Sequence, residues 1–151
     1  MQIITDINHI NRIEWQQLLA NSHTATWFQS PEAYDFFASM PTIMSPFICA
    51  VTSDSQLKGI MLGYITKEQN PIKQFFTRRA IINGGPLLAE DISNEELTAL
   101  LEQVQNLIKN KAIYIETRNF HDFSKWQTTF ETCGFIFQPH YDIHIACENS
   151  P

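Results

Sequence analysis

Apolar residues recur at helical spacing in three stretches of the chain, and each stretch begins with a residue that can cap a helix. The longest starts at Ser93 and Glu96, which have the spacing of a capping box, and keeps its apolar stripe to Ile108. Asn11 and Ser30 precede two shorter stretches near the N-terminus. The residues that we expect these two helices to bury are Ile13, Trp15, Leu18 and Leu19 in the first, and Tyr34, Phe36 and Phe37 in the second.

Stretches rich in β-branched and aromatic residues predict three strands before the long helix, at residues 47–52, 57–65 and 75–82. The polar sequence at 53–55 is typical of a turn, so the first two strands form a hairpin. The third strand runs into the loop Asn83-Gly84-Gly85-Pro86.

Three more elements are predicted after the long helix. Residues 112–117 read as a short buried strand. Ser124 is the expected cap of a last helix, which ends before Gly134, a residue suited to a left-handed C-terminal position. Residues 135–146 read as a final long strand. This order of elements predicts an α/β (α+β) fold, with residues 1–151 forming a single domain.

Composition narrows the class of protein. Of the 151 residues, 44% are hydrophobic and 17% charged, which is typical of a folded domain and excludes a disordered chain. We find neither a signal peptide nor an apolar run long enough to cross a bilayer. Cys49, Cys133 and Cys147 lie far apart, without the spacing of a zinc or redox motif. We therefore expect a cytoplasmic protein with reduced thiols.

The charged residues are unevenly distributed. A net charge of −6 disfavours broad binding to nucleic acid. Half of the ten basic residues fall in one region and could face an anionic ligand; they are Lys58, Lys67, Lys73, Arg78 and Arg79. The simpler interpretation is a solvated hairpin surface.

Two local patterns suggest chemistry, and each has a simpler interpretation. The backbone amides of the 83–86 loop can approach an anion, but the loop has neither a dinucleotide fingerprint nor a P-loop, so a plain turn is simpler. Tyr114, Glu116 and Arg118 alternate along one strand and share a face. Glu116 could be a general base for an amine, whereas an ion pair between Glu116 and Arg118 is the simpler interpretation.

Metal and hydrolase sites are not expected. His140, Asp142 and His144 share a face of the last predicted strand, and these are residue types that bind zinc. A strand places its first and fifth residues roughly 13 Å apart, so joint coordination is awkward and a polar surface is simpler. The pair His121-Asp122 lacks a nucleophile if Ser124 caps a helix and Cys133 is buried.

Four segments occur in an order that matches a known family: WFQSPEAY at 27–34, RAIINGGPL at 79–87, AIYIETRN at 112–119 and ETCGF at 131–135. Together they resemble the first domain of the Fem-type peptidoglycan-bridge aminoacyltransferases of bacteria, relatives of the GNAT N-acetyltransferases. The resemblance covers nearly the whole chain. It implies a GNAT-like domain with a mixed, mostly antiparallel central sheet flanked by about four helices.

The resemblance also implies a function, which is transfer of an acyl or aminoacyl group to an amine of a peptidoglycan precursor. Acetyl-CoA or aminoacyl-tRNA would be the acyl donor. Glu116 would be the catalytic base. The residues expected to bind substrate are Tyr114, Arg118 and Asn119 in the cleft, Gly84 and Gly85 beside the acyl group, and Arg78 and Arg79 at a phosphate.

The chain departs from the family in features that keep other functions open. It lacks the Arg/Gln-x-x-Gly-x-Gly/Ala loop that holds the pyrophosphate of acetyl-CoA in GNAT enzymes, and it has no basic residue between Arg12 and Lys58. It has the length of one of the family's two tandem domains, so a homodimer or a partner transferase chain would complete the cleft. The alternatives are a non-catalytic module that binds a precursor or peptide, and a stand-alone acetyl-CoA N-acetyltransferase.

Overall fold

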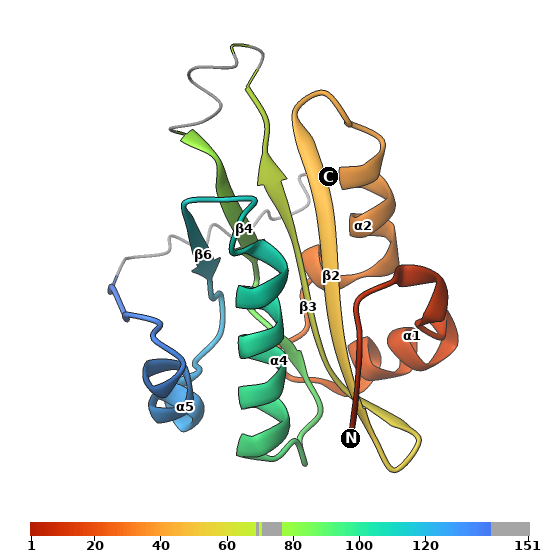
Figure 1. Cartoon of the computed structure of the whole chain (residues 1–151). Coiled ribbons are helices and arrows are strands. Elements are labelled where there is room, and N and C mark those ends of the chain that lie inside the picture. The colour runs from red at the N-terminus through yellow and green to blue at the C-terminus, as the bar shows by residue number, and fades with distance from the viewer. Residues whose placement is uncertain (69, 71–76, 140–151) are drawn as a thin grey trace, which may run out of the picture.

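The fold is built on one twisted sheet (Figure 1). The structure is a computed structural model, and it describes residues 1–68, 70 and 77–139. The strands run in the order β1-β2-β3-β4-β6, and β5 also pairs with β3. Neighbouring strands are antiparallel except for β4 and β6, which are parallel. The strands are β1 (Gln2–Ile4), β2 (Met44–Ser53), β3 (Gln56–Thr66), β4 (Arg79–Asn83), β5 (Leu87–Leu88) and β6 (Tyr114–Arg118).

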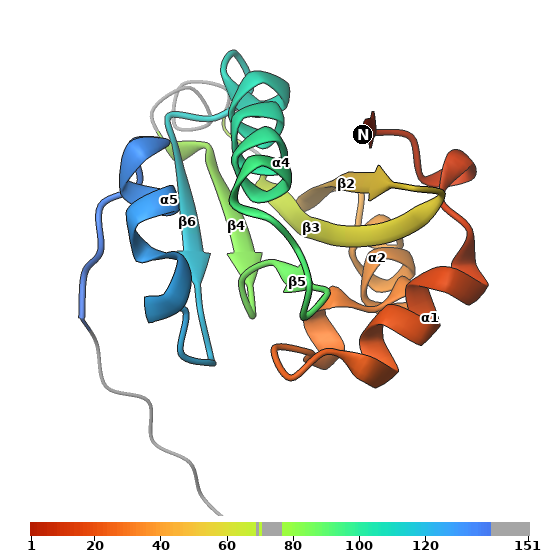
Figure 2. The same ribbon diagram turned by 90° about the horizontal axis from the view of Figure 1, so that it is seen from below.

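Helices cover both faces of this sheet (Figure 2). On one face lie α1 (Arg12–Asn21) and α2 (Pro31–Ala38), and on the other lie α4 (Asn94–Ile108) and α5 (Gln127–Thr132). Short 3-10 helices add η1 (Ile7–His9), η2 (Trp27–Gln29) and η3 (Ser124–Trp126). None of the helices described is both long and apolar enough to span a membrane. The predicted α/β class and the mixed, mostly antiparallel sheet are confirmed.

Two apolar cores hold the layers together. Cys49 and Met61 face α4, whereas Ile48 and Leu62 face α1 and α2. Successive residues of a strand point to opposite faces, so strands buried on both sides read as continuous apolar runs. This explains why β2 and β3 were recognisable as strands without an alternating pattern.

The predicted starts of the first three helices are confirmed. The Asn11 side chain accepts hydrogen bonds from the backbone amides of Ile13 and Glu14, and Ser30 Oγ accepts from the amide of Ala33. Ser93 Oγ accepts from the amide of Glu96 at 3.2 Å, and Glu96 Oε2 accepts from the amide of Ser93 at 2.8 Å. These caps satisfy amides that have no partner within the helix.

Two residues expected in the core are exposed instead. Ile13 is 67% exposed, because residues two apart on a helix lie about 200° apart around its axis, and Trp15 is the one that faces the sheet. Phe36 is 48% exposed, whereas its neighbour Phe37 is 3% exposed. Phe36 packs against the Trp27 ring at 5.8 Å instead of entering the core.

The strand predictions need four corrections. β1 was not predicted, because it has only three residues and gains its conformation by pairing with β2. β6 begins at Tyr114, which is exposed, and its other four residues are half-buried, so the strand is not buried as predicted. Residues 135–139 are not in a strand, and 140–146 lie outside the described residues. β4 begins only at Arg79, while 75–76 of the predicted strand also lie outside them.

The last helix starts differently from the prediction. Ser124 lies inside η3 and does not cap α5; its amide instead donates to Asp122 Oδ1 at 2.8 Å. Gly134 follows the helix with a φ of 82°, as predicted.

Trp15 offers a test of how α1 is attached to η2. Its indole Nε1 donates to the backbone carbonyl of Gln29 at 2.7 Å, and the side chain is fully buried. We expect Trp15→Phe to lower the free energy of unfolding by about 1–3 kcal/mol, because it leaves a buried carbonyl without a partner. Trp27→Phe is the matched control, since Trp27 is 51% exposed. Equal effects of both variants in urea denaturation would contradict this account.

Candidate functional site

The path from β4 to β5 is interrupted by a bulge. Tyr64 of β3 pairs with Ile81 of β4, and Ile60 of β3 pairs with Leu87 of β5. Between these two pairs β3 has three residues, whereas the chain that runs from β4 to β5 has five, 82–86. Two residues must therefore loop out. Gly84 and Gly85 have φ angles of 83° and 74°, which favour glycine, and they form this glycine bulge, residues 83–86.

The glycine bulge lies where two parallel strands part. The amide of Gly84 donates to the carbonyl of Arg118, the last residue of β6, at 2.8 Å. Beyond this bond the chain that leaves β4 turns back toward β3 and forms β5, while the chain that leaves β6 continues through Asn119. Pro86 has no N–H and cannot extend the ladder between them.

Gln29 supports the glycine bulge from the α1–α2 side of the sheet. Its fully buried side chain donates from Nε2 to the carbonyls of Gly84 and Gly85 at 3.1 and 3.0 Å. Its Oε1 accepts from the amide of Thr26 at 2.7 Å. One amide group thus satisfies three backbone groups of two distant segments.

Thr24 adds a further bond from the same loop. Its buried hydroxyl donates to the carbonyl of Pro86 at 3.3 Å. Thr24 and Gln29 together therefore bind three successive carbonyls of the glycine bulge, at positions 84, 85 and 86.

Two buried polar atoms at the glycine bulge have no hydrogen-bond partner among the described residues. They are Thr26 Oγ1, which is in contact with the position of a Cβ on Gly84, and Asn119 Oδ1. A Cβ on Gly85 would lie 2.5 Å from Asn119 Oδ1 and 3.2 Å from Phe123 Cε2. Unpaired buried polar atoms are uncommon in folded proteins, and a catalytic role is one of their recognised explanations.

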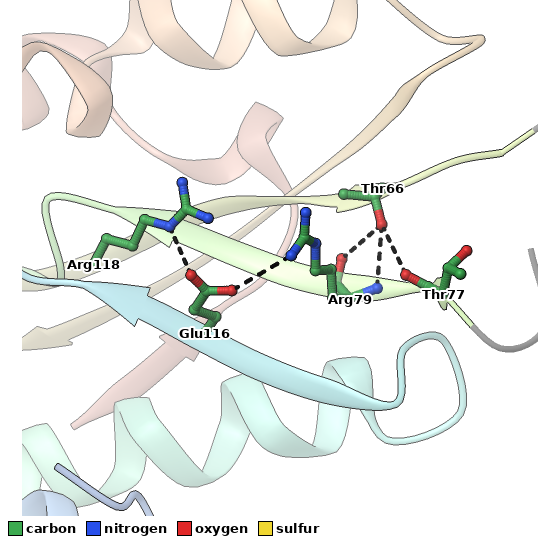
Figure 3. A network of polar contacts seen from close by, with 5 residues as sticks. All are labelled: Thr66, Thr77, Arg79, Glu116 and Arg118. Atoms are coloured by element: carbon green, nitrogen blue, oxygen red, sulfur yellow. Dashed lines mark hydrogen bonds and ion pairs between the residues drawn. The ribbon is translucent and has the colours of Figure 1, made fainter. Parts of the chain in front are cut away.

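Next to the glycine bulge, β4 and β6 form a charged face (Figure 3). We define it as Arg79, Tyr114, Glu116 and Arg118. Arg118 Nε donates to Glu116 Oε1 at 2.7 Å, and Arg79 Nη1 lies 4.0 Å from Glu116 Oε2. A hydrogen bond with Tyr114 is the main cause that raises the pKa of Arg79. The predicted ion pair between Glu116 and Arg118 is therefore confirmed.

The backbone of Arg79 is held separately from its side chain. Thr66 Oγ1 accepts from the amide of Arg79 at 3.2 Å and lies 3.4 Å from the carbonyls of Arg79 and Thr77 (Figure 3). This contact ties the start of β4 to the end of β3.

Aromatic rings border the charged face on the side of α2. Ile115 of β6 packs in the α4 core, so the alternate residues Glu116 and Arg118 lie on the α1–α2 side. The ring contacts there are Phe28 with Phe120 at 5.9 Å, Trp27 with Phe28 at 5.4 Å, and Phe37 with Tyr64 at 4.8 Å. The rings of Phe28, Phe37 and Tyr64 thus lie on the same side of the sheet as Glu116 and Arg118.

The fold brings most of the predicted site residues into two adjoining groups. The charged face holds Arg79, Tyr114, Glu116 and Arg118, and the glycine bulge is in contact with Asn119. Arg78 lies just before β4, where its carbonyl accepts from the amide of Ile113 at 2.8 Å. No signal in the sequence singled out Thr24, Thr26 or Phe123. Gln29 lies within the family-like 27–34 segment, but nothing in its spacing showed its role.

The basic residues that are close in sequence do not form one patch. Lys58, near the start of β3, is 9% exposed and donates to Asp91 Oδ2 at 2.7 Å and Gln56 Oε1 at 3.0 Å. Lys67 follows the other end of β3, about 30 Å along the strand, and donates to the carbonyl of Pro41. Lys73 lies outside the described residues. The prediction of one hairpin surface is thus wrong for Lys58, whose buried side chain pairs with the exposed carboxylate of Asp91.

The N-terminus of α4 is occupied by the chain's own carboxylates. Partial burial opposes ionisation of Glu96, but hydrogen bonds from the amide and hydroxyl of Ser93 outweigh it and lower the pKa of Glu96. Glu90, Asp91 and Glu95 lie in the same turn and the residues before it. This helix end is capped by negative charge, so a second anion there would be repelled.

The described thiols are poor nucleophiles. Burial raises the pKa of Cys49 to about 12, and burial followed by the charge of Glu102 raises the pKa of Cys133. Only the thiolate is strongly nucleophilic. Cys133 is half-buried, less than predicted, and Asp122 is engaged with the amide of Ser124.

Across residues 1–68, 70 and 77–139, no group of three His, Cys, Asp or Glu side chains could hold a metal ion. His140, Asp142, His144 and Cys147 lie outside these ranges, so the sequence-based interpretation of them stays a prediction.

Comparison with known proteins identifies the fold. No protein-family model matches the chain, and no curated protein sequence matches it. A probable acetyltransferase of known structure is 17% identical with a TM-score of 0.63, over 98% of this chain and 100% of that one. FemX is 18% identical with a TM-score of 0.67, over 89% of this chain and 32% of FemX. The ribosomal-protein-alanine N-acetyltransferase from Brucella melitensis biovar Abortus 2308 is 11% identical with a TM-score of 0.62, over 96% of this chain and 100% of that one.

At these identities the comparison shows the fold alone, which is that of the GNAT-type acyltransferases. This chain corresponds to about a third of FemX and to the full length of the two smaller proteins.

The contact between the glycine bulge and Asn119 can be tested by a double mutant. We expect Gly85→Ala to lower the free energy of unfolding by about 2–3 kcal/mol, from a positive φ and the close Asn119 Oδ1. Asn119→Ala should recover about 1 kcal/mol of this loss by removing the obstructing oxygen. Gly134→Ala is the control, since its φ is positive but its Cβ would meet nothing. Additive effects of Gly85→Ala and Asn119→Ala in urea denaturation would contradict the contact.

Proposed function

We propose that this chain is a Fem-type transferase domain that acts in the transfer of an acyl or aminoacyl group to an amine of a peptidoglycan precursor. The observation that carries the proposal is the glycine bulge at the parting of β4 and β6, directly beside the charged face. The shared fold with GNAT-type acyltransferases and with FemX supports it.

In this proposal the acceptor amine binds at Glu116. The Oε1 atom is engaged by Arg118, but Oε2 lies 4.0 Å from Arg79 and can accept a proton from an ammonium group. The amine nitrogen would then attack the acyl carbonyl and form the new C–N bond. The donor oxygen or sulfur would leave with the electron pair of the broken bond and take up the proton held by Glu116, and the proton that the nitrogen loses would return to the Glu116 carboxylate. Arg79 and Arg118 would bind anionic groups of the acceptor.

The residues at α4 do not fit the diphosphate of CoA. A neighbour in the fold comparison, an aminoglycoside N-acetyltransferase, was solved in complex with CoA, at 9% identity and a TM-score of 0.60. A helix N-terminus can hold a diphosphate when its amides are free and no anion lies nearby. Here Glu96 occupies the amide of Ser93, and further carboxylates surround this end of α4.

The donor is therefore expected to be presented from outside this chain. A net charge of −6 gives the chain alone little attraction for tRNA. We propose that a partner transferase domain holds an aminoacyl-tRNA, while this chain binds the acceptor.

The second candidate is a non-catalytic module that binds a precursor or peptide. It is favoured by the ion pair of Glu116, since one carboxylate oxygen is already engaged by Arg118. A module would use the charged face for binding alone.

A transfer assay tests the proposal. With aminoacyl-tRNA and a precursor peptide that carries a free amine, we expect transfer that Glu116→Gln reduces about 100-fold or more. Glu131→Gln is the control, because Glu131 lies on α5, away from the charged face. Saturable binding of the peptide without any transfer, even with added partner transferase, would favour the module. Unchanged transfer by Glu116→Gln would refute the base assignment.

Acetyl-CoA provides a separate test of the donor. Because the N-terminus of α4 is capped by carboxylates, we expect calorimetric titration to show no saturable binding at micromolar concentration. Saturable micromolar binding would instead support a stand-alone acetyltransferase and would refute this account of α4.

A further inference from the structure

We infer that Gln29 is a positioning residue of the acyl-transfer site, because it fixes the direction in which the Gly85 amide points. The inference rests on the proposed function, which supplies an acyl carbonyl for that amide to bind. Gln29 itself would not touch the substrate. It would act through the backbone of the glycine bulge.

The first step is the constraint on the carbonyls. Gln29 Nε2 donates to the carbonyls of both Gly84 and Gly85, so both oxygens point toward Gln29. Glycines with positive φ have many alternative conformations, and the backbone alone would not select this one. The two hydrogen bonds select it.

The second step follows from peptide geometry. No described peptide bond is cis, and in a trans peptide the C=O and the following N–H point in opposite directions. Since the Gly84 carbonyl points toward Gln29, the Gly85 N–H points away from it. The next peptide ends at Pro86, which has no N–H. Of these two peptides only the one between Gly84 and Gly85 has an N–H, and this Gly85 N–H points away from Gln29.

The third step is that this donor has no internal use. Among the described residues, the Gly85 amide donates to no group. Asn119 Oδ1, which also has no partner there, lies 2.5 Å from the position of a Cβ on Gly85. A donor aimed in advance at an acyl oxygen stabilises the negative charge that develops during transfer.

The position of Gln29 is itself fixed by neighbouring elements. Trp15 Nε1 binds its carbonyl, and Ser30, the next residue, caps α2. The side chain is fully buried, so its amide cannot turn toward water. Gln29 therefore links α1 and α2 rigidly to the glycine bulge.

Two variants separate the functions of the amide. Gln29→Met keeps the approximate volume and removes all three hydrogen bonds. Gln29→Glu keeps the acceptor for the Thr26 amide but removes the donors. Ser30→Ala is the matched control, because it removes the cap of α2 at the next residue and makes no change at the glycine bulge.

The first readout needs no ligand. In amide NMR spectra we expect both Gln29 variants to shift the Gly84 and Gly85 signals. They should also speed hydrogen exchange of the Gly84 amide at least tenfold, with the amides of α4 unchanged. Ser30→Ala should leave the Gly84 and Gly85 signals in place. Unmoved signals in both Gln29 variants would overturn the inference.

The second readout isolates the acyl oxygen. S-acetylpantetheine carries a thioester carbonyl without the diphosphate of CoA, and pantetheine lacks the acyl group. We expect the wild-type protein to bind the thioester about 3–10-fold more tightly than the thiol, the range that one hydrogen bond provides. Both Gln29 variants should lose this preference while their affinity for pantetheine stays within about twofold. Ser30→Ala should keep the preference.

The outcomes distinguish this inference from the proposed function. If the wild-type protein does not prefer the thioester, the Gly85 amide does not bind an acyl oxygen and the inference is overturned, whereas the proposed function is decided separately by the transfer assay. If the wild-type protein and both Gln29 variants prefer it equally, only the role of Gln29 is overturned. Equal loss of affinity for both probes in Ser30→Ala and Gln29→Met would assign Gln29 a purely structural role.

Discussion

The hydrogen bonds of the buried Gln29 amide are the contact on which the arrangement of the site depends. A buried amide is costly unless its polar atoms are paired, and here they pair with Thr26, Gly84 and Gly85. These partners come from segments more than fifty residues apart in the chain. The polar requirement of one side chain thus fixes where the first helical layer meets the sheet and how the glycine bulge is oriented.

Charge is arranged differently at the N-terminus of α4 and at the charged face. At the start of α4, the Glu96 carboxylate accepts from the amide of Ser93, and Glu95 adds a second negative charge to the first turn. At the charged face, Glu116 lies between two guanidinium groups that are 43–44% exposed. Exposed ion pairs contribute little to stability. Replacing the contacts of Glu116 with the two arginines by contacts with a ligand therefore costs little free energy. The distribution suits a domain that binds a charged acceptor and receives its acyl donor from elsewhere.

The sequence predicted much of the fold because the signals were local. Capping residues at Asn11, Ser30 and Ser93 depend on neighbours within three or four positions, and so does the apolar stripe of α4. β1 and the exposure of Phe36 could not be predicted in this way. The first depends on pairing with β2, and the second on which side of α2 meets the sheet.

The sequence by itself determined the order of elements, the alternation that places Glu116 and Arg118 on one face, and the glycines that permit a bulge. Only the tertiary structure decided that β4 and β6 run side by side, which brings Arg79 to Glu116. It also separated Lys58 from Lys67 along one strand and placed Gln29 beneath Gly84 and Gly85. Helix and turn signals act through bonds between near neighbours, whereas a site assembled across a sheet depends on register and packing between distant segments.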